Sequence, residues 1–240
     1  MSSAVDTVEI AGVSKRYGRH RALASIEVSF GKGLCALLGP NGAGKSTMLG
    51  IISTLVRPTA GKVVYRSADG AEPSGSELRR HIGVLAHEPL VYGQLSAEEN
   101  LAFWAGLYGV TDAANRANHL LERVGLDQKA RKRAASTYSR GMLQRLALAR
   151  ALLHEPSVLL LDEPFSGLDR RGIEALQHTL AAARDEGKVV LVVTHDLEAI
   201  AEHTDHVVVL RRGKLAHEER RKAGDFEYRE LQDIYHRYSD

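Results

Sequence analysis

The first 87 residues of the chain alternate short apolar runs with polar turns. Apolar runs of this length, bounded by Gly, Pro or polar residues, favour β-strands. Between the second and third runs the sequence Gly-Lys-Gly at 31–33 indicates a tight turn, so an antiparallel arrangement is expected here. The predicted strands cover residues 8–10, 26–30, 34–38, 62–65 and 82–85.

The pattern changes from Ser96 onward to a helical period. Ser96 and Glu99 form the sequence of a capping box, and apolar residues then recur three and four positions apart. Further helices are predicted over residues 112–124 and from Ser139 through Leu152. Residues 88–153 are therefore expected to form a helical lobe.

Strands and helices alternate in the second half. Buried strands are predicted at 158–162, 189–194 and 207–210, with a helix over 170–186 and another after residue 195. This alternation favours a mainly parallel α/β sheet. We expect residues 1–87 and 154–216 to form this core with an N-terminal antiparallel β subdomain, the lobe to be inserted between them, and residues 217–240 to be a charged, weakly helical tail.

Composition narrows the class of protein. The 240 residues are 44% hydrophobic and 26% charged, which is ordinary for a globular domain, and the net charge of +2 is too small to indicate nucleic acid binding. The single cysteine, Cys35, excludes an internal disulfide and is expected to pack inertly in its strand. The longest apolar runs fall far short of the roughly 18 residues that a membrane span requires. We therefore expect a protein without a signal peptide or span, able to dock on a membrane partner.

The candidate chemistry begins with a glycine-rich turn between a buried strand and a helix. This order, with Lys and Ser at the helix start, is a phosphate-binding loop, because glycines let backbone N–H groups face a phosphate. Lys45 is expected to reach the terminal phosphates, and Ser46 to bind Mg²⁺ through its hydroxyl. The loop comprises Gly39, Pro40, Asn41, Gly42, Ala43, Gly44, Lys45, Ser46 and Thr47.

Two carboxylates end the strand at 158–162. A carboxylate at the carboxyl end of a parallel strand faces the crevice where ligands bind, so Asp162 is expected to hold Mg²⁺ and Glu163 to orient or deprotonate the attacking water. His195 ends the next strand, and it is either a structural histidine or a group that bonds the γ-phosphate.

A second helix start, at Ser139 and Gly141, also suits a phosphate. One nucleotide does not need two such helix starts, so this one is predicted to serve a nucleotide held by a second chain. Tyr17, between the first two strands, is either a surface aromatic of a hairpin or a ring that stacks on a base.

Together these motifs resemble the nucleotide-binding domain of ATP-binding-cassette (ABC) transporters over nearly the whole chain. The resemblance implies a P-loop NTPase fold of ABC type that binds ATP and Mg²⁺. It implies Tyr17 as the adenine-stacking ring, Glu163 as the catalytic base, His195 as the switch histidine, and residues 166–169 as the D-loop. It also implies that Ser139 and Gly141 cap the γ-phosphate of ATP bound to the opposite subunit.

The chain departs from the family pattern at two places. The signature usually reads Leu-Ser-Gly-Gly-Gln, but residues 138–142 read Tyr-Ser-Arg-Gly-Met. His87 stands where a glutamine normally approaches Mg²⁺ and the water, and histidine brings sensitivity to pH. Segments 87–92, 95–101, 108–110 and 138–142 are similar to those of the ATPase of the haem exporter used in cytochrome c maturation.

The resemblance further implies a dimer, either of this chain or with a related ATPase, on the cytoplasmic face of the cell membrane. The partner is expected to be a membrane-spanning transporter subunit, docked near His87 and residues 101–108, whose apolar stripe is alternatively lobe core. Other short exporters of drugs, lipids or polysaccharides share most of these segments. A soluble ABC machine of DNA repair or translation usually carries two cassettes or zinc cysteines, which this sequence lacks, and a regulator that does not hydrolyse is disfavoured by Asp162, Glu163 and His195.

Overall fold

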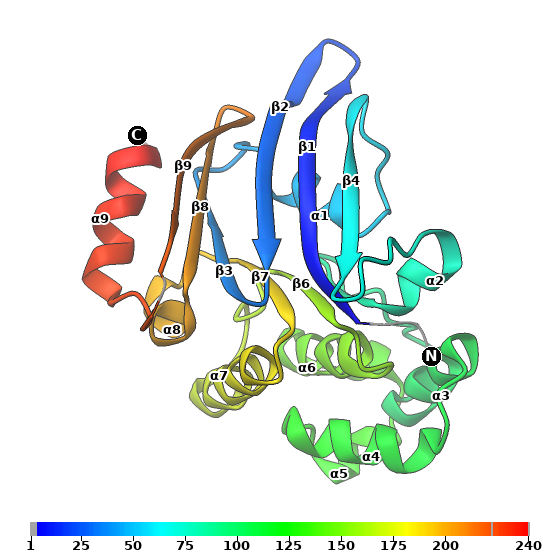
Figure 1. Cartoon of the computed structure of the whole chain (residues 1–240). Helices are drawn as coiled ribbons and strands as arrows, with labels where there is room; N and C mark the ends of the chain where they lie inside the picture. The colour runs from blue at the N-terminus through cyan, green and yellow to red at the C-terminus, as the bar shows by residue number, and fades with distance from the viewer. Residues whose placement is uncertain (1–3, 222, 240) are drawn as a thin grey trace.

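Two β-sheets organise the chain, of which the computed structural model describes residues 4–221 and 223–239 (Figure 1). The smaller sheet is antiparallel, has three strands and follows the order β2-β1-β4. Its strands are β1 (Val5–Tyr17), β2 (His20–Gly31) and β4 (Ala60–Ser67). The antiparallel N-terminal sheet is confirmed, although its strands are longer than their apolar runs and the turn at residues 31–33 leads from β2 into β3 of the other sheet rather than joining an antiparallel pair.

The larger sheet has six strands in the order β5-β6-β7-β3-β8-β9, parallel except for β9. Its central strands are buried on both faces, which explains why they read as continuous apolar runs rather than as alternating ones. The strands are β3 (Gly33–Leu38), β5 (Ile82–Leu85), β6 (Val158–Asp162), β7 (Val189–Val193), β8 (His206–Arg211) and β9 (Lys214–Arg220). The predicted α/β class, mainly parallel with an antiparallel N-terminal sheet, is confirmed.

Alternate residues of each central strand enter two separate cores. Leu159 and Leu161 of β6 pack with the helices of the lobe and with the helix after β6, whereas Val158 and Leu160 pack toward the antiparallel sheet and α1. This follows from the two-residue period of side chains along a strand. The helices are α1 (Lys45–Ile52), α2 (Gly75–Arg80), α3 (Ala97–Tyr108), α4 (Ala113–Arg123), α5 (Gln128–Arg131), α6 (Arg140–Leu152), α7 (Arg170–Asp185), α8 (Leu197–Ile200) and α9 (Tyr228–Ser239), with 3₁₀ turns η1 (Ala135–Thr137) and η2 (Ala201–His203).

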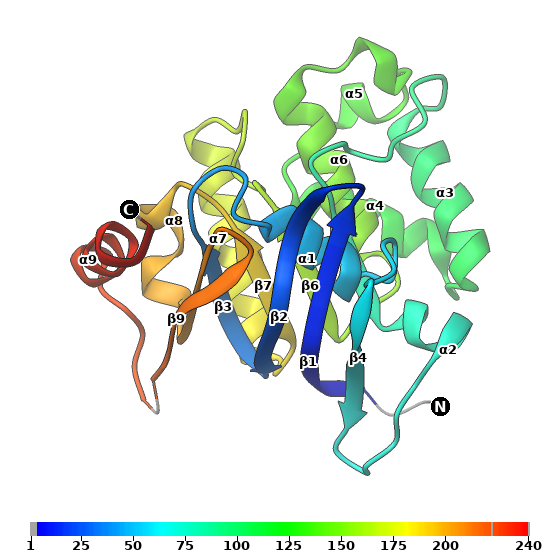
Figure 2. The same ribbon diagram turned by 90° about the horizontal axis from the view of Figure 1, so that it is seen from above.

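Helices α3 to α6 gather on one side of the molecule, away from α9 (Figure 2). The predicted capping box opens α3: the Ser96 hydroxyl accepts from the Glu99 N–H, and the Glu99 carboxylate accepts from the Ser96 N–H. Ser139 caps α6 as predicted, because its side chain accepts from the Met142 N–H.

Two elements were not predicted from the sequence. The polar loop after β4 contains the start of α2, and the tail expected to be weakly helical holds the end of β9 and the 12-residue helix α9. Phe226 and Leu231 are buried against the core, so tertiary packing stabilises this segment despite its many charges. No helix within the described residues is long and apolar enough to cross a membrane.

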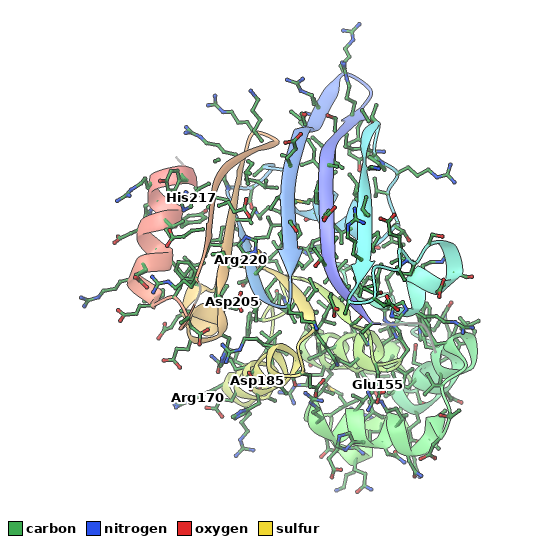
Figure 3. The ribbon with its side chains drawn as sticks, in the orientation of Figure 1. Glu155, Arg170, Asp185, Asp205, His217 and Arg220 are labelled. Carbon is green, nitrogen blue, oxygen red and sulfur yellow. The ribbon has the colours of Figure 1, made fainter. Side chains whose placement is uncertain are left out.

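A cluster of polar residues around the buried His206 joins β3, β8 and β9; Figure 3 labels two of its members, Asp205 and Arg220. His206, only 2% exposed, lies 3.1 Å from a carboxylate oxygen of Glu218 through Nε2, and its Nδ1 lies 3.0 Å from the Arg220 guanidinium. Burial lowers the pKa of His206 to about 4. The imidazole is therefore neutral, accepting from Arg220 at Nδ1 and donating to Glu218 at Nε2.

Candidate functional site

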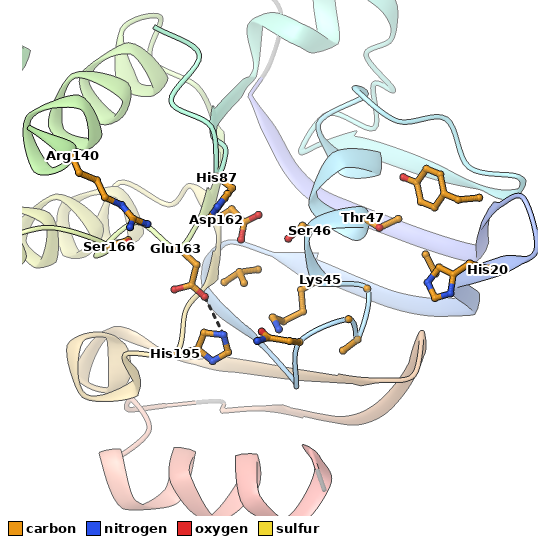
Figure 4. A pocket seen from close by; sticks show the side chains of 17 residues that line it. His20, Lys45, Ser46, Thr47, His87, Arg140, Asp162, Glu163, Ser166 and His195 are labelled. Carbon is orange, nitrogen blue, oxygen red and sulfur yellow. Dashed lines mark ion pairs between the residues drawn. The ribbon is translucent and has the colours of Figure 1, made fainter. Parts of the chain in front are cut away.

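A cavity of about 560 Å³ opens at the carboxyl ends of the central parallel strands (Figure 4). The strands place there the loop after β3, the residues that end β6, and His195 after β7. Parallel α/β sheets bind their ligands at this edge, and the volume is in the range of small-molecule sites. Sheet topology thus brings together side chains that lie far apart in sequence.

The predicted phosphate-binding loop forms one wall of this cavity. Its residues from Asn41 to Thr47 line the cavity, whereas Gly39 and Pro40 lie behind it. The buried Lys45 ammonium donates to the carbonyl oxygens of Gly39, at 2.6 Å, and Pro40, at 3.0 Å. Gly39 has a φ of 136°, and a Cβ there would lie 2.1 Å from the Leu210 carbonyl oxygen, so only glycine fits.

The start of α1 is left open at the floor of the loop. Gly44 is its N-cap residue, and no side chain among the described residues caps the helix. The first backbone N–H groups of an α-helix lack intrahelical acceptors and carry a partial positive charge. The geometry therefore provides donors for a phosphate next to Lys45.

Asp162 and Glu163 face the cavity from the end of β6. The Glu163 N–H donates to Val193 O at 2.8 Å, and its backbone has a φ of 50°, a conformation that costs energy in a residue with a Cβ. Burial raises the pKa of Glu163 and the Asp162 carboxylate adds to this rise, whereas the interactions of Glu163 with His195 and Lys45 oppose it. The side chain is thus a better proton acceptor than an ordinary surface carboxylate.

His195 and Glu163 lie together, as the sequence predicted from their neighbouring strands. β6 pairs with β7, and His195 Nε2 lies 3.5 Å from Glu163 Oε1 (Figure 4). β7, the strand that the sequence predicted over residues 189–194, lies between β6 and the strand of the phosphate loop. Lys45 and Glu163 therefore line the cavity from strands that are not adjacent.

His87 and Arg140 reach the same cavity from the lobe side. Both also line an adjoining cavity of about 550 Å³, together with Asp162, Glu163 and Ser166. His87 therefore faces the two carboxylates, as its position in the sequence suggested. Sequence reasoning missed the side chains of Arg140 and Ser166, although both stood inside motifs that had been singled out.

The far end of the cavity lies at the β1–β2 hairpin. Tyr17 and His20 are a directly opposed pair of that hairpin, and both line the cavity. Directly opposed residues of an antiparallel pair project on the same face. Tyr17 is thus both an exposed aromatic of the hairpin and a residue of the cavity wall, so it combines the two interpretations of the sequence. His20 was not predicted as a site residue.

Ser139 and Gly141 are not among the residues that line the cavity. Ser139 is exposed, and its hydroxyl proton remains free to donate because only its oxygen accepts from Met142. A Cβ at Gly141 would lie 2.5 Å from the Gly167 carbonyl oxygen, so this glycine is also needed for packing within the chain. The structure therefore separates this helix start from the phosphate loop of its own chain.

Gln144 ties that helix start to the carboxylate segment. Its buried amide donates to the carbonyl oxygens of Glu163, at 3.0 Å, and Pro164, at 3.1 Å. The next residue along α6, Arg145, forms an ion pair with Asp169 at 2.5 Å. Nothing in the sequence marked Gln144 except that it is a polar residue on the inner face of α6.

The chain is similar to known proteins over most of its length. The family model described as ABC transporter matches residues 23–166. The lantibiotic transport ATP-binding protein SrtF of Streptococcus pyogenes is 35% identical over 209 residues, covering 87% of this chain and 88% of SrtF. The doxorubicin resistance ATP-binding protein DrrA of Mycobacterium tuberculosis is 38% identical over 230 residues, covering 91% and 68%.

Solved structures show the same similarity. The dimeric structure of MJ0796, a bacterial ABC transporter cassette, superposes with a TM-score of 0.80 at 27% identity, covering 90% of this chain and 99% of that one. The same cassette, in a dimeric post-hydrolysis state bound to ADP and Pi, superposes equally well, with a TM-score of 0.80.

Proposed function

The chain belongs to the ABC transporter family as an ATP-binding and ATP-hydrolysing subunit, and from this premise we propose that it powers export through a separate membrane-spanning subunit. One observation carries the proposal: a single cavity holds Lys45, Asp162, Glu163 and His195. Phosphoryl transfer needs positioning and charge stabilisation, and these residues supply both.

The phosphate chain of ATP would lie along the loop and the start of α1, with Lys45 exchanging its carbonyl partners for phosphate oxygens. Ser46 and Asp162 offer the oxygen ligands that Mg²⁺ prefers, together with the phosphates. Bound Mg²⁺ would neutralise the developing charge. Among the described residues no cluster of three His, Cys, Asp or Glu side chains could hold a metal.

Glu163 acts as the base that orients and deprotonates the attacking water, and its raised pKa suits that role. His195, within 3.5 Å of Glu163, bonds the γ-phosphate and so reports its presence. His87 takes the place of the usual glutamine beside the carboxylates. Its imidazole would make this contact dependent on pH.

Two chains pair head to tail about a two-fold axis, either with each other or with a related ATPase. Ser139 and Gly141 of one chain then cap the γ-phosphate held by the other, which accounts for their position outside their own chain's cavity. The likeness to a dimeric cassette supports this arrangement.

A docking face of apolar side chains would receive the membrane-spanning subunit. We define it as Leu55, Leu90, Tyr92, Phe103 and Leu107, all exposed. Tyr92 and Phe103 pack ring against ring and onto Trp104, which shares a groove with Leu55 and Leu90. Exposed apolar residues gathered in this way mark an interaction surface.

Residues 101–108 were expected to be either docking surface or lobe core, and their apolar side chains fall into a buried set and an exposed set. Leu101 and Ala105 are buried in the lobe core, whereas Phe103 and Leu107 are 42% and 61% exposed. We therefore propose that the membrane-spanning subunit docks on the side of α3 that exposes Phe103 and Leu107. This proposal places the chain on the cytoplasmic face of the membrane, with residues 88–153 as the docking lobe, residues 1–87 and 154–216 as the core and residues 217–240 as the tail.

The cargo is chosen by the membrane subunit. The similarity of segments 87–92 and 138–142 to the haem-exporter ATPase makes haem one candidate, and the names of SrtF and DrrA favour an amphiphilic peptide or drug. Deletion of the gene separates these cargoes. Loss of c-type cytochromes would indicate haem, and increased sensitivity to an amphiphilic compound would indicate a drug or peptide.

The central experiment replaces Glu163 by Gln. ATP turnover, measured as phosphate release, should be abolished, whereas ATP-dependent dimers should persist in size-exclusion chromatography because the phosphate loop is intact. Asp185→Asn, a carboxylate on the exposed end of α7, is the matched control. Full turnover in the Glu163→Gln variant would remove Glu163 as the base.

A further inference from the structure

The aromatic ring at the base end of the cavity has a cation fixed to one of its faces. The Lys15 ammonium lies 5.0 Å from the centroid of the Tyr17 ring. Lys15 does not line the cavity, whereas Tyr17 does. The ammonium therefore covers one face of a ring that belongs to the cavity wall, while Lys15 itself stays outside the cavity.

Lys15 is itself held in place. Its ammonium donates to the Arg57 carbonyl oxygen at 2.7 Å, in the segment before β4. Next to it, the Arg16 N–H donates to the Thr59 hydroxyl at 3.0 Å, and the Thr59 N–H donates to the Ser14 carbonyl at 2.8 Å. Three hydrogen bonds thus fix the end of β1 to residues 57–59. A flexible lysine at a hairpin tip would lack such support.

We propose that Lys15, Tyr17 and His20 form a base clamp, in which Lys15 is a positioning residue that holds the Tyr17 ring from behind and His20 bonds the edge of the base. The proposal rests on the ATP binding proposed above. An aromatic ring carries a negative face, which opposes face-to-face stacking, and a cation on the far face draws that density away. Lys15 therefore both orients the ring and makes its open face better suited to a purine.

His20 supplies the second part of the clamp. It lies opposite Tyr17 in the hairpin register, so both side chains project toward the same end of the cavity. A neutral imidazole offers one donor and one acceptor, which can pair with the polar edge of a base. Tyr17 cannot supply this edge contact while its face is used for stacking.

The test distinguishes contacts that bind the base of ATP from contacts that bind its phosphates. Binding of ATP and of inorganic tripolyphosphate, which has no base, is measured by calorimetry on the full chain carrying Glu163→Gln, so that no ATP is consumed. Tyr17→Ala should weaken ATP binding about tenfold. Lys15→Met and His20→Ala should each weaken it about threefold. Tripolyphosphate binding should not change in any of them.

Two variants distinguish the cation from packing and from general charge. Lys15→Arg keeps a cation over the ring and should bind ATP as the parent chain does. Lys62→Ala removes an exposed lysine of the adjacent strand β4 and should have no effect, although it changes the net charge equally. In the chain with Glu163 intact, Lys15→Met should raise the KM for ATP about threefold and leave kcat unchanged, which is the signature of a contact that stabilises the ground state and the transition state equally.

The outcomes separate the clamp from the proposed function. Equal ATP affinity in the Lys15→Met and parent chains, with a loss in Tyr17→Ala, would overturn the role of Lys15. A matching loss of tripolyphosphate affinity would mean that Lys15 acts through charge or folding rather than through the ring. If the parent chain bound no ATP, the proposed function itself would fail, independently of the clamp.

Discussion

The loop before α1 and the turn before α6 are both open helix starts, but the fold supports them differently. The first follows β3, whose residues Leu34, Ala36 and Leu37 are completely buried between two neighbouring strands. The second begins at Ser139, exposed at the edge of the lobe and held by side-chain contacts to the segment after β6. In the site proposed above, the core thus presents a preorganised half, and the lobe presents a half whose position depends on where the lobe lies.

The largest effect expected is at the preorganised half. Lys45→Ala removes the cation nearest the phosphate loop and should lower ATP turnover about 1,000-fold, because charge stabilisation dominates phosphoryl transfer. Phosphate release under saturating ATP measures it, with Lys62→Ala as the control. Turnover within tenfold of the parent chain would show that the loop does not hold the reacting phosphate.

The next two variants compare how much a core residue and a residue of the docking face contribute to the free energy of unfolding. Leu160→Ala empties a completely buried site in β6 and should lower the free energy of unfolding by about 3 kcal/mol. Phe103→Ala removes an exposed ring and should change it by less than about 0.5 kcal/mol. Urea denaturation followed by circular dichroism measures both. A cost above 2 kcal/mol for Phe103→Ala would mean that the ring stabilises the lobe itself rather than waiting for a partner.

Lowering the pH should reduce the free energy of unfolding through His206, the first residue of β8. An unfolded histidine takes up a proton below about pH 6.5, whereas folded His206 stays neutral down to a pKa of about 4. The unfolded state therefore gains protons first, and the free energy of unfolding should fall by about 2 kcal/mol between pH 6.5 and pH 5 from this residue. His206→Gln should reduce that slope in denaturation curves recorded across the range. An unchanged slope would show that Arg220 and Glu218 stabilise the charged and neutral forms equally.

The smallest effect is expected at the lobe half. Ser139→Ala removes one phosphate donor and one helix cap, and turnover should fall about tenfold. Mixing chains that carry Ser139→Ala with chains that carry Lys45→Ala creates dimers with one intact site, so ATP-dependent dimer formation should exceed that of either variant alone. No gain on mixing would place Ser139 in the site of its own chain.

The sequence alone was sufficient to predict features that are defined by a short stretch of neighbouring residues. The loop at residues 39–47 and the pair Asp162 and Glu163 follow directly from a strand and the turn after it, so a short stretch of chain defines them. The capping box at Ser96 is equally local, and it was predicted to the residue.

Features that depend on distant partners were missed. Helix α9 is stabilised by packing of Phe226 and Leu231 against the core, which composition alone does not reveal. Lys15 acquires its position from the Arg57 carbonyl, 42 residues away, and Gln144 acquires its partners from the end of β6. No local pattern distinguishes these residues from ordinary polar residues on a strand or a helix.

The two hydrogen bonds from Gln144 connect helix α6 of the lobe directly to the backbone of Glu163 and Pro164, so the two segments are expected to move together. A rotation of α6 away from β6 must either break both bonds or carry the backbone of Glu163 with it, and that backbone is already in a strained conformation. Linkage between two sites is reciprocal. In the proposed mechanism, a partner bound to α3 would therefore respond to the alignment of Glu163, and the state of the nucleotide would alter how tightly that partner is bound.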